Sequence, residues 1–168
     1  MIPIIIMSIS LILDGLISNY LPYLVNNLSI LTPLLTLTSI VIIYPFYKKK
    51  NIEYFIVCIA FGLLYDLMYT NLFLTNASLF LLMSLVVKYI YNNFNINSIK
   101  ILFYITLIIC LYETSLAISF LVFNIVPITI NNLLYKIINS LLLNLLYGQL
   151  LFNVLKIIPK KYTKIKIN

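Results

Sequence analysis

Charged side chains are scarce in this sequence, and histidine, arginine and tryptophan are absent from it. Only 9% of its 168 residues are charged, whereas a soluble domain usually has about a quarter of charged residues to coat its surface. Instead, 63% of the residues are hydrophobic and the mean hydropathy is +1.10. These values exclude an ordinary soluble fold and predict a single all-α integral membrane domain, residues 1–168.

The missing side chains also exclude most kinds of catalytic site. Without histidine or arginine, the usual machinery of metal-assisted hydrolysis and phosphoryl transfer is lacking. Cys58 and Cys110 lie inside apolar runs, where we interpret them as small packing residues and not as a disulfide or metal site. Tyr65-Asp66 matches the first half of the presenilin-like aspartyl protease signature, but the second half, Gly-x-Gly-Asp, is absent. We therefore expect no enzymatic activity, no metal and no cofactor.

Long apolar runs account for most of the chain and predict a polytopic bundle of six transmembrane helices. Short connections separate the runs, so neighbouring spans must run antiparallel. The third and fourth runs together cover about 40 residues, roughly twice what a bilayer accommodates, and we divide them at Thr70-Asn71. The predicted spans are residues 2–22, 28–47, 53–70, 72–92, 99–124 and 129–157, followed by a basic tail, residues 158–168.

Lysine positions predict how the bundle is oriented. The first, third and fifth connections contain no lysine, whereas ten of the eleven lysines lie at the other connections and in the tail. Because lysine is enriched on the cytoplasmic side, both termini are expected in the cytoplasm, N-in and C-in. We therefore predict a multi-pass inner-membrane protein that contacts lipids and not nucleic acid. The ten residues are Lys48, Lys49, Lys50, Lys88, Lys100, Lys156, Lys160, Lys161, Lys164 and Lys166.

Three carboxyl side chains, Asp14, Asp66 and Glu113, lie inside predicted spans. Each is about 12–14 residues from the cytoplasmic start of its span, which predicts a shared layer just beyond mid-membrane. Such a group costs about 2.5–3.5 kcal/mol at a helix centre and should face protein or a wet cavity. Lys136, in the last span, lies slightly above this layer. We expect an Asp or Glu to pair with Lys136, and protonation, a partner chain or a cavity to compensate the other carboxyls.

Small and polar residues recur on one face of several predicted helices, the pattern by which membrane helices approach closely. We interpret these faces mainly as packing seams, and the costly Asp66 and Glu113 as candidates for a further role. The faces comprise Ser10, Asp14 and Ser18; Cys58, Gly62, Asp66 and Tyr69; Thr106, Cys110, Glu113 and Ala117; and Asn132, Lys136, Asn139, Ser140, Asn144 and Gly148.

The segment GLLYDLMYTNLFLTNASLFLL, residues 62–82, resembles the signature of the MreD family of rod shape-determining proteins. That family has Gly-x-x-x-Asp in its third span, usually with Tyr before the Asp, then a short loop and a fourth span with a small-polar start. The chain departs from the family in one respect. The family usually has Gly after the leucine of the loop, whereas the loop of this chain reads Asn71-Leu72-Phe73-Leu74. The residues that match the pattern are Gly62, Tyr65, Asp66, Tyr69 and Asn76.

This resemblance implies a non-enzymatic membrane scaffold of the bacterial cell-elongation (rod) complex. MreD-like proteins associate with the bitopic protein MreC, and through it with the MreB filament and with RodA and its transpeptidase, which build side-wall peptidoglycan. We expect a polar outer-half layer in this chain to form a polar core or to dock a partner helix. Its candidate members are Gly62, Tyr65, Asp66, Tyr69, Asn76, Asp14, Glu113 and Lys136.

The MreD family is also similar in fold to the S-components of energy-coupling-factor transporters, which leaves an alternative function open. The chain would then be a six-span S-component that binds a vitamin or metal ion near its outer face. Such a protein needs polar or aromatic loops on the outer side. The outer connections here, 23–27, 71 and 124–127, are short and uncharged, which favours the scaffold.

Overall fold

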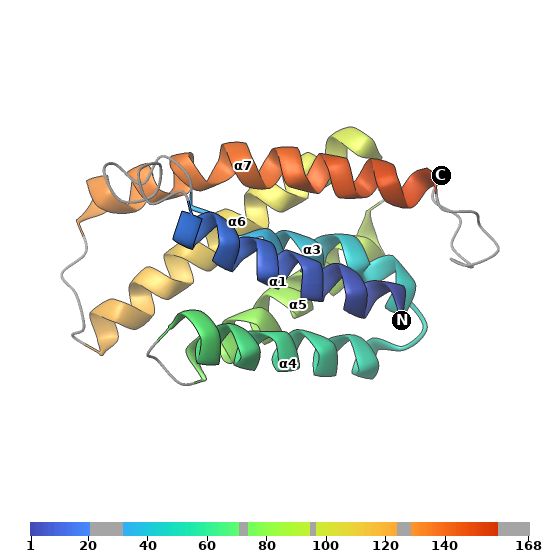
Figure 1. Ribbon diagram of the computed structural model, residues 1–168, viewed down its shortest axis with the longest axis horizontal. Coiled ribbons are helices and arrows are strands. Elements are labelled where there is room, and N and C mark those ends of the chain that lie inside the picture. The colour runs from blue at the N-terminus through green and yellow to red at the C-terminus, as the bar shows by residue number, and fades with distance from the viewer. Residues whose placement is uncertain (21–31, 71–73, 95–96, 124–128, 158–168) are drawn as a thin grey trace.

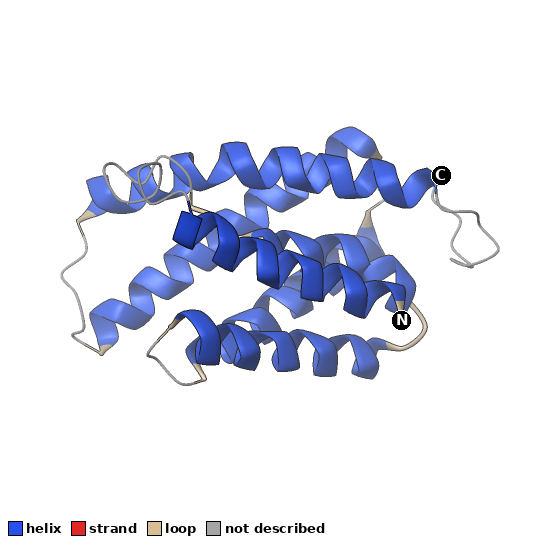
Figure 2. Cartoon of the chain, in the orientation of Figure 1, coloured by secondary structure: helices blue, strands red, loops and turns tan. Residues whose placement is uncertain are grey.

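The computed structural model describes residues 1–20, 32–70, 74–94, 97–123 and 129–157 (Figure 1). Within these ranges the regular structure is entirely helical (Figure 2), and the predicted all-α fold class is confirmed. The elements are α1 (Ile2–Tyr20), α3 (Leu35–Ile43), the 3₁₀ helix η1 (Tyr44–Tyr47), α4 (Asn51–Tyr69), α5 (Thr75–Asn93), α6 (Ser98–Val122) and α7 (Ile130–Ile157).

Four of the described helices are long and apolar enough to cross a membrane: α1, α4, α6 from Ile99 and α7 as far as Lys156. Their outward faces carry large apolar side chains, among them Leu67, which is 70% exposed, and Leu142, which is 64% exposed. Helices that remain apolar on their outer face suit lipid better than water. These features indicate a membrane protein.

Consecutive helices run in opposite directions (Figure 1). Helices α1, α4 and α6 begin at the end of the bundle where the chain begins, and α3, α5 and α7 finish there. Because of this alternation, Lys48 after η1, Lys88 and Lys156 near the ends of α5 and α7, and Lys100 in the first turn of α6 gather at one end. We call it the lysine end, and the opposite end, where α6 finishes and α7 begins, the far end.

The short helix α3 lies at the centre of the bundle. All nine of its residues are buried, and it packs against α1, α5, α6 and α7. Together with η1, it covers Leu35–Tyr47, about 20 Å at 1.5 Å per residue, whereas the hydrocarbon core of a bilayer is about 30 Å thick. The α3–η1 segment is therefore an internal element and not a helix of membrane length.

The predicted second span, 28–47, is not a continuous helix in its described part. Residues 32–34 are not helical, and α3 begins only at Leu35. Pro33 is the physical reason, because proline lacks a backbone N–H and drives the residue before it out of the helical region. The other five predicted spans correspond to helices whose described ends differ by no more than three residues. The outer connections 23–27, 71 and 124–127 and the basic tail 158–168 lie outside the described residues.

Tyrosines close the core at the lysine end. Two of their hydroxyls donate to backbone carbonyls of α3, Tyr54 to Ile40 (3.0 Å) and Tyr91 to Val41 (2.8 Å). The ring of Tyr44 lies 5.0 Å from the rings of both Tyr54 and Tyr91, a normal aromatic packing distance. The C-terminal half of α3 is thereby fixed to α4 and α5.

Candidate functional site

Asp66 lies in the last turn of α4, and its carboxylate accepts hydrogen bonds from the first turn of α5. Its Oδ1 accepts hydrogen bonds from the backbone N–H of Asn76 (3.0 Å) and from Asn76 Nδ2 (2.8 Å). Its Oδ2 accepts the backbone N–H of Ala77 (3.1 Å). The first N–H groups of a helix have no partner within the helix, and a negative charge there is favoured by the helix dipole. The preceding helix thus supplies the N-terminal cap of α5, since Leu74, at the cap position, forms no side-chain cap.

Gly62, one turn before Asp66, lets the two helices of this hairpin touch. A Cβ atom at this position would lie 2.6 Å from Ala77 Cα and 2.9 Å from the carbonyl oxygen of Asn76. Residues four apart lie on the same helix face, so Gly62 and Asp66 both face the start of α5. The Gly-x-x-x-Asp spacing therefore sets both the distance between α4 and α5 and their register.

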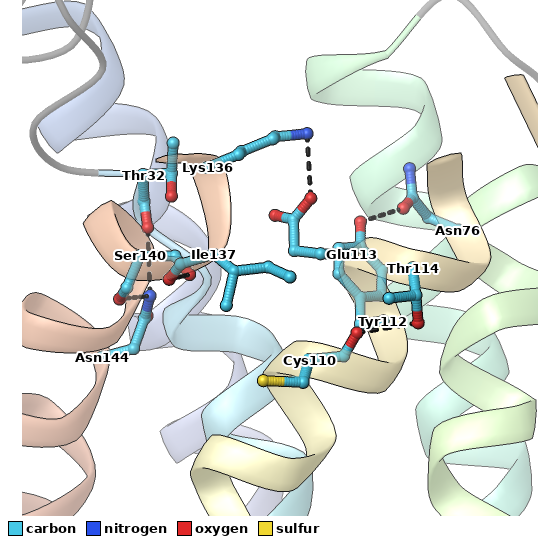
Figure 3. A network of polar contacts seen from close by, with 10 residues as sticks. All are labelled: Thr32, Asn76, Cys110, Tyr112, Glu113, Thr114, Lys136, Ile137, Ser140 and Asn144. Atoms are coloured by element: carbon cyan, nitrogen blue, oxygen red, sulfur yellow. Dashed lines mark hydrogen bonds and ion pairs between the residues drawn. The ribbon is translucent and has the colours of Figure 1, made fainter. Parts of the chain in front are cut away.

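Asn76 continues the contact from α5 to α6. Its Oδ1 accepts a hydrogen bond from the hydroxyl of Tyr112, 2.5 Å away (Figure 3). The side chains of Asn76 and Tyr112 are buried, and the Tyr112 ring packs on that of Phe80, with centroids 6.1 Å apart. A chain of hydrogen bonds thus runs from Tyr112 through Asn76 to Asp66 and connects three helices.

Tyr65 and Tyr69, the two aromatic members of the motif, pack the α4–α5 hairpin against its surroundings. The Tyr69 hydroxyl donates to the carbonyl of Leu11 in α1 (2.7 Å), and its ring fills the space beside Gly15. The Tyr65 ring lies 5.0 Å from that of Tyr69 and 5.7 Å from that of Phe80. Tyr69 therefore joins α4 to α1, while Tyr65 packs between α4 and α5.

Asp14 repeats the role of Asp66 at a second helix start. Its Oδ1 accepts the backbone N–H of Leu35 (2.7 Å), and its Oδ2 accepts the backbone N–H (2.9 Å) and the hydroxyl (2.6 Å) of Thr36. These N–H groups belong to the first turn of α3. Asp14 and Asp66 are each only 2% exposed. Two of the three intramembrane carboxyls therefore bind the start of a helix that lies next in the bundle.

Asn144 of α7 satisfies the irregular backbone that precedes α3. Its Oδ1 accepts the N–H of Leu34 (2.9 Å), and its Nδ2 donates to the carbonyls of Thr32 (3.0 Å) and Ser140 (2.6 Å) (Figure 3). Non-helical backbone at membrane depth needs partners from the protein because lipid offers none. The break at Pro33 is therefore compensated by one buried amide.

Glu113 of α6 pairs with Lys136 of α7, with Glu113 Oε2 and Lys136 Nζ 3.0 Å apart (Figure 3). The Glu113 side chain is 3% exposed and that of Lys136 44%. The prediction that an acid pairs with Lys136 is confirmed, and the acid is Glu113. Backbone and side-chain donors of the same chain surround the carboxyl groups of Asp14 and Asp66. That protonation, a partner chain or a cavity compensates these two groups stays a prediction.

The candidate residues thus form a polar core, and the described hydrogen bonds do not place the three carboxyls in contact with one another. Direct docking of a partner on Asp66 and Gly62 does not fit this arrangement, because both are buried between α4 and α5. Sequence reasoning missed Thr36 and Tyr112 and treated Asn144 only as part of a seam. Pro33 was the sequence feature that could have predicted the late start of α3. It lies inside an apolar run that is long enough to be interpreted as one complete span.

The chemistry of this core is hydrogen bonding and ion pairing. Its carboxylates accept bonds from fixed donors within the chain, an arrangement that stabilises helix contacts. Among the described residues, no three His, Cys, Asp or Glu side chains converge as metal ligands. In comparisons with known proteins, no family model, no curated protein and no solved structure matches this chain.

Proposed function

We propose that this chain is a non-enzymatic membrane scaffold of the bacterial cell-elongation complex, similar to MreD. In this proposal it crosses the inner membrane six times with both termini in the cytoplasm, the α3–η1 segment belonging to the second crossing. It docks an MreC-like bitopic protein, and through it serves the MreB filament and the RodA–transpeptidase pair that maintain cell shape.

The convergence of the motif residues carries this proposal. Gly62, Asp66 and Asn76 meet at one contact between α4 and α5, where they respectively permit close approach, cap the helix and connect it to α6. Because these three residues form one structural contact, their spacing in the sequence is a property of the fold, and this supports the resemblance to MreD.

Lys136 marks where a partner helix would dock. Its ammonium has three donors, and the side chain is 44% exposed although Glu113 pairs with it. A charge at membrane depth normally faces protein or water, so a membrane helix with a polar group at this level would complete its surroundings. Around Lys136, the neighbouring α7 side chains Leu134, Tyr135 and Ile138 are exposed as well, so such a helix would meet an apolar surface beside the charge.

Affinity purification of the tagged chain from membranes of its own host tests the proposal. We expect a single-span, coiled-coil MreC-like protein to be recovered with the wild-type chain, and less of it with Lys136→Met at equal chain levels. Lys48→Met is the matched control, because Lys48 is an exposed lysine at the lysine end, and its recovery should equal that of the wild type.

Two outcomes would contradict the scaffold. One is that no bitopic partner is recovered and cells depleted of the chain keep their shape. The other is that the purified chain contains a stoichiometric vitamin or metal ion, which would establish the transporter S-component instead. Equal recovery with Lys136→Met and the wild type would remove Lys136 from the docking surface.

A further inference from the structure

A groove lies on the surface between α5 and α6 at the lysine end. Its volume is about 550 Å³, within the range of about 300–1,000 Å³ typical of small-molecule sites. Ile90 and Tyr104, 6% and 7% exposed, form its buried part, and Tyr89 and Phe103, 66% and 64% exposed, stand at its margin. The groove is therefore an apolar and aromatic surface with one charged lining residue, Lys100.

In the proposed topology, the groove lies at the level of a membrane–water interface. Its lining comes from the last turns of α5, as far as Phe94, and from the first turns of α6, where Lys100 lies. Aromatic side chains are enriched at this level of membrane proteins because their rings suit the headgroup region. An occupant of the groove would thus have an apolar part toward the bundle centre and a polar part near Lys100.

Among the described residues, no carboxylate side chain pairs with Lys100. The sequence has four acidic residues: Glu53 pairs with Lys50 (2.6 Å), Glu113 pairs with Lys136 (3.0 Å), and Asp14 and Asp66 are buried at helix starts. In the described part of the chain, no carboxylate side chain remains for Lys100, whose own side chain is exposed. The groove therefore fits an occupant with a negative charge.

We propose that this groove binds one anionic phospholipid, with its phosphate on Lys100 Nζ and the upper part of an acyl chain along Ile90 and Tyr104. The size of the groove favours a lipid over a partner helix. Its lining stretches, Val86–Phe94 and Ile99–Leu107, extend about 12 Å along each helix, whereas a spanning helix needs a face of about 30 Å. The lipid site is independent of the scaffold function proposed above.

Native mass spectrometry of the full-length chain in detergent, with phosphatidylglycerol and phosphatidylcholine as probes, tests this site. We expect the wild type to retain one phosphatidylglycerol in preference to phosphatidylcholine. Lys100→Gln should lower that retention about fivefold, corresponding to about 1 kcal/mol for one lysine near an anionic surface. Lys48→Gln, which removes an exposed lysine at the same end outside the groove, should leave the preference unchanged.

A second variant tests the apolar part of the groove. Leu107→Trp places a large ring in a half-buried lining position and should reduce retention of both lipids, with unchanged helix content by circular dichroism. Equal retention of both lipids by the wild type, or an equal loss with Lys48→Gln and Lys100→Gln, would overturn the proposal. A photo-crosslinker at position 103 that captures a protein and not lipid would overturn it in favour of a protein interface.

Discussion

Asp14 and Asp66 show how a single carboxylate is accommodated inside a membrane bundle without a lysine. Each accepts two backbone N–H groups from the first turn of a helix and at least one side-chain donor. Unsatisfied N–H groups in lipid cost several kcal/mol each, and an isolated buried charge is also unfavourable. Bringing the two together offsets part of both costs, because the N–H groups gain an acceptor and the helix dipole stabilises the carboxylate.

We expect Gly62→Ala to destabilise the protein by about 1–3 kcal/mol, the usual range for overpacking a close contact. The added methyl would meet the backbone of Ala77, which cannot move without shifting α5. The thermal unfolding midpoint in detergent measures the effect. Gly148→Ala is the matched control, because its methyl would meet the flexible end of the Ile105 side chain. Equal losses in both variants would contradict the argument.

Leu74→Gly should raise the stability by roughly 1–2 kcal/mol, the cost of holding a non-glycine residue in the left-handed region. Leu74 has a φ of 68°, and its side chain is 52% exposed, so little packing is lost with it. Leu82→Gly, at a half-exposed position inside α5, should lower the stability by about 1 kcal/mol. Chemical denaturation of the two variants should therefore give opposite signs, and two losses would exclude the strained turn.

At the scale of elements, α3 is a short helix with both ends bound by other helices. Asp14 and Asn144 hold its N-terminal side, and Tyr54 and Tyr91 hold carbonyls in its second half. A helix that is buried all round has no water to satisfy its ends. Polar side chains from α1, α4, α5 and α7 therefore determine where it lies.

Asp14→Ala should destabilise the bundle by about 3 kcal/mol or more, since each hydrogen bond to a charged group contributes about 1.5–3 kcal/mol. Hydrogen exchange should show faster exchange at the amides of Leu35 and Thr36, which lose their acceptor. Asp14→Asn keeps one acceptor oxygen and should lie between the wild type and Asp14→Ala. Ser18→Ala, at an exposed position of the same helix, serves as the control. Unchanged protection of both amides in Asp14→Ala would contradict the capping role.

The sequence predicted those elements whose determinants are local. Apolar runs of membrane length located five helices, and the sparse charges predicted an acidic partner for Lys136, which the structure identifies as Glu113. The start of α3 depends instead on Pro33 together with Asp14 and Asn144 from distant segments. The capping roles of Asp14 and Asp66 could not be predicted either. Every residue except proline has a backbone N–H group, so the sequence does not show which of these groups a carboxylate will bind.

Across the whole molecule, three intramembrane acids and their neighbours connect all six described α-helices. Asp66 joins α4 to α5 and reaches α6 through Asn76. Asp14 joins α1 to α3, and Glu113 joins α6 to α7. Tyr69, beside Asp66 on α4, donates to a backbone carbonyl of α1. Lipid tails are as apolar as the helix surfaces, so apolar burial alone gives little direction to helix association. Fixed polar contacts therefore specify which helices are neighbours.

The alternating helix directions lead to a test of orientation by cysteine labelling in intact cells. In a Cys58→Ala, Cys110→Ser background, we expect Phe123→Cys to react with an impermeant maleimide from outside, because Phe123 ends α6 at the far end and is 71% exposed. Lys48→Cys, at the lysine end, should react only after permeabilisation, because lysine-rich connections stay in the cytoplasm. Labelling of Lys48→Cys from outside would show that the bundle has the opposite orientation in the membrane. Lys136, near the start of α7, would then lie nearer the cytoplasmic face.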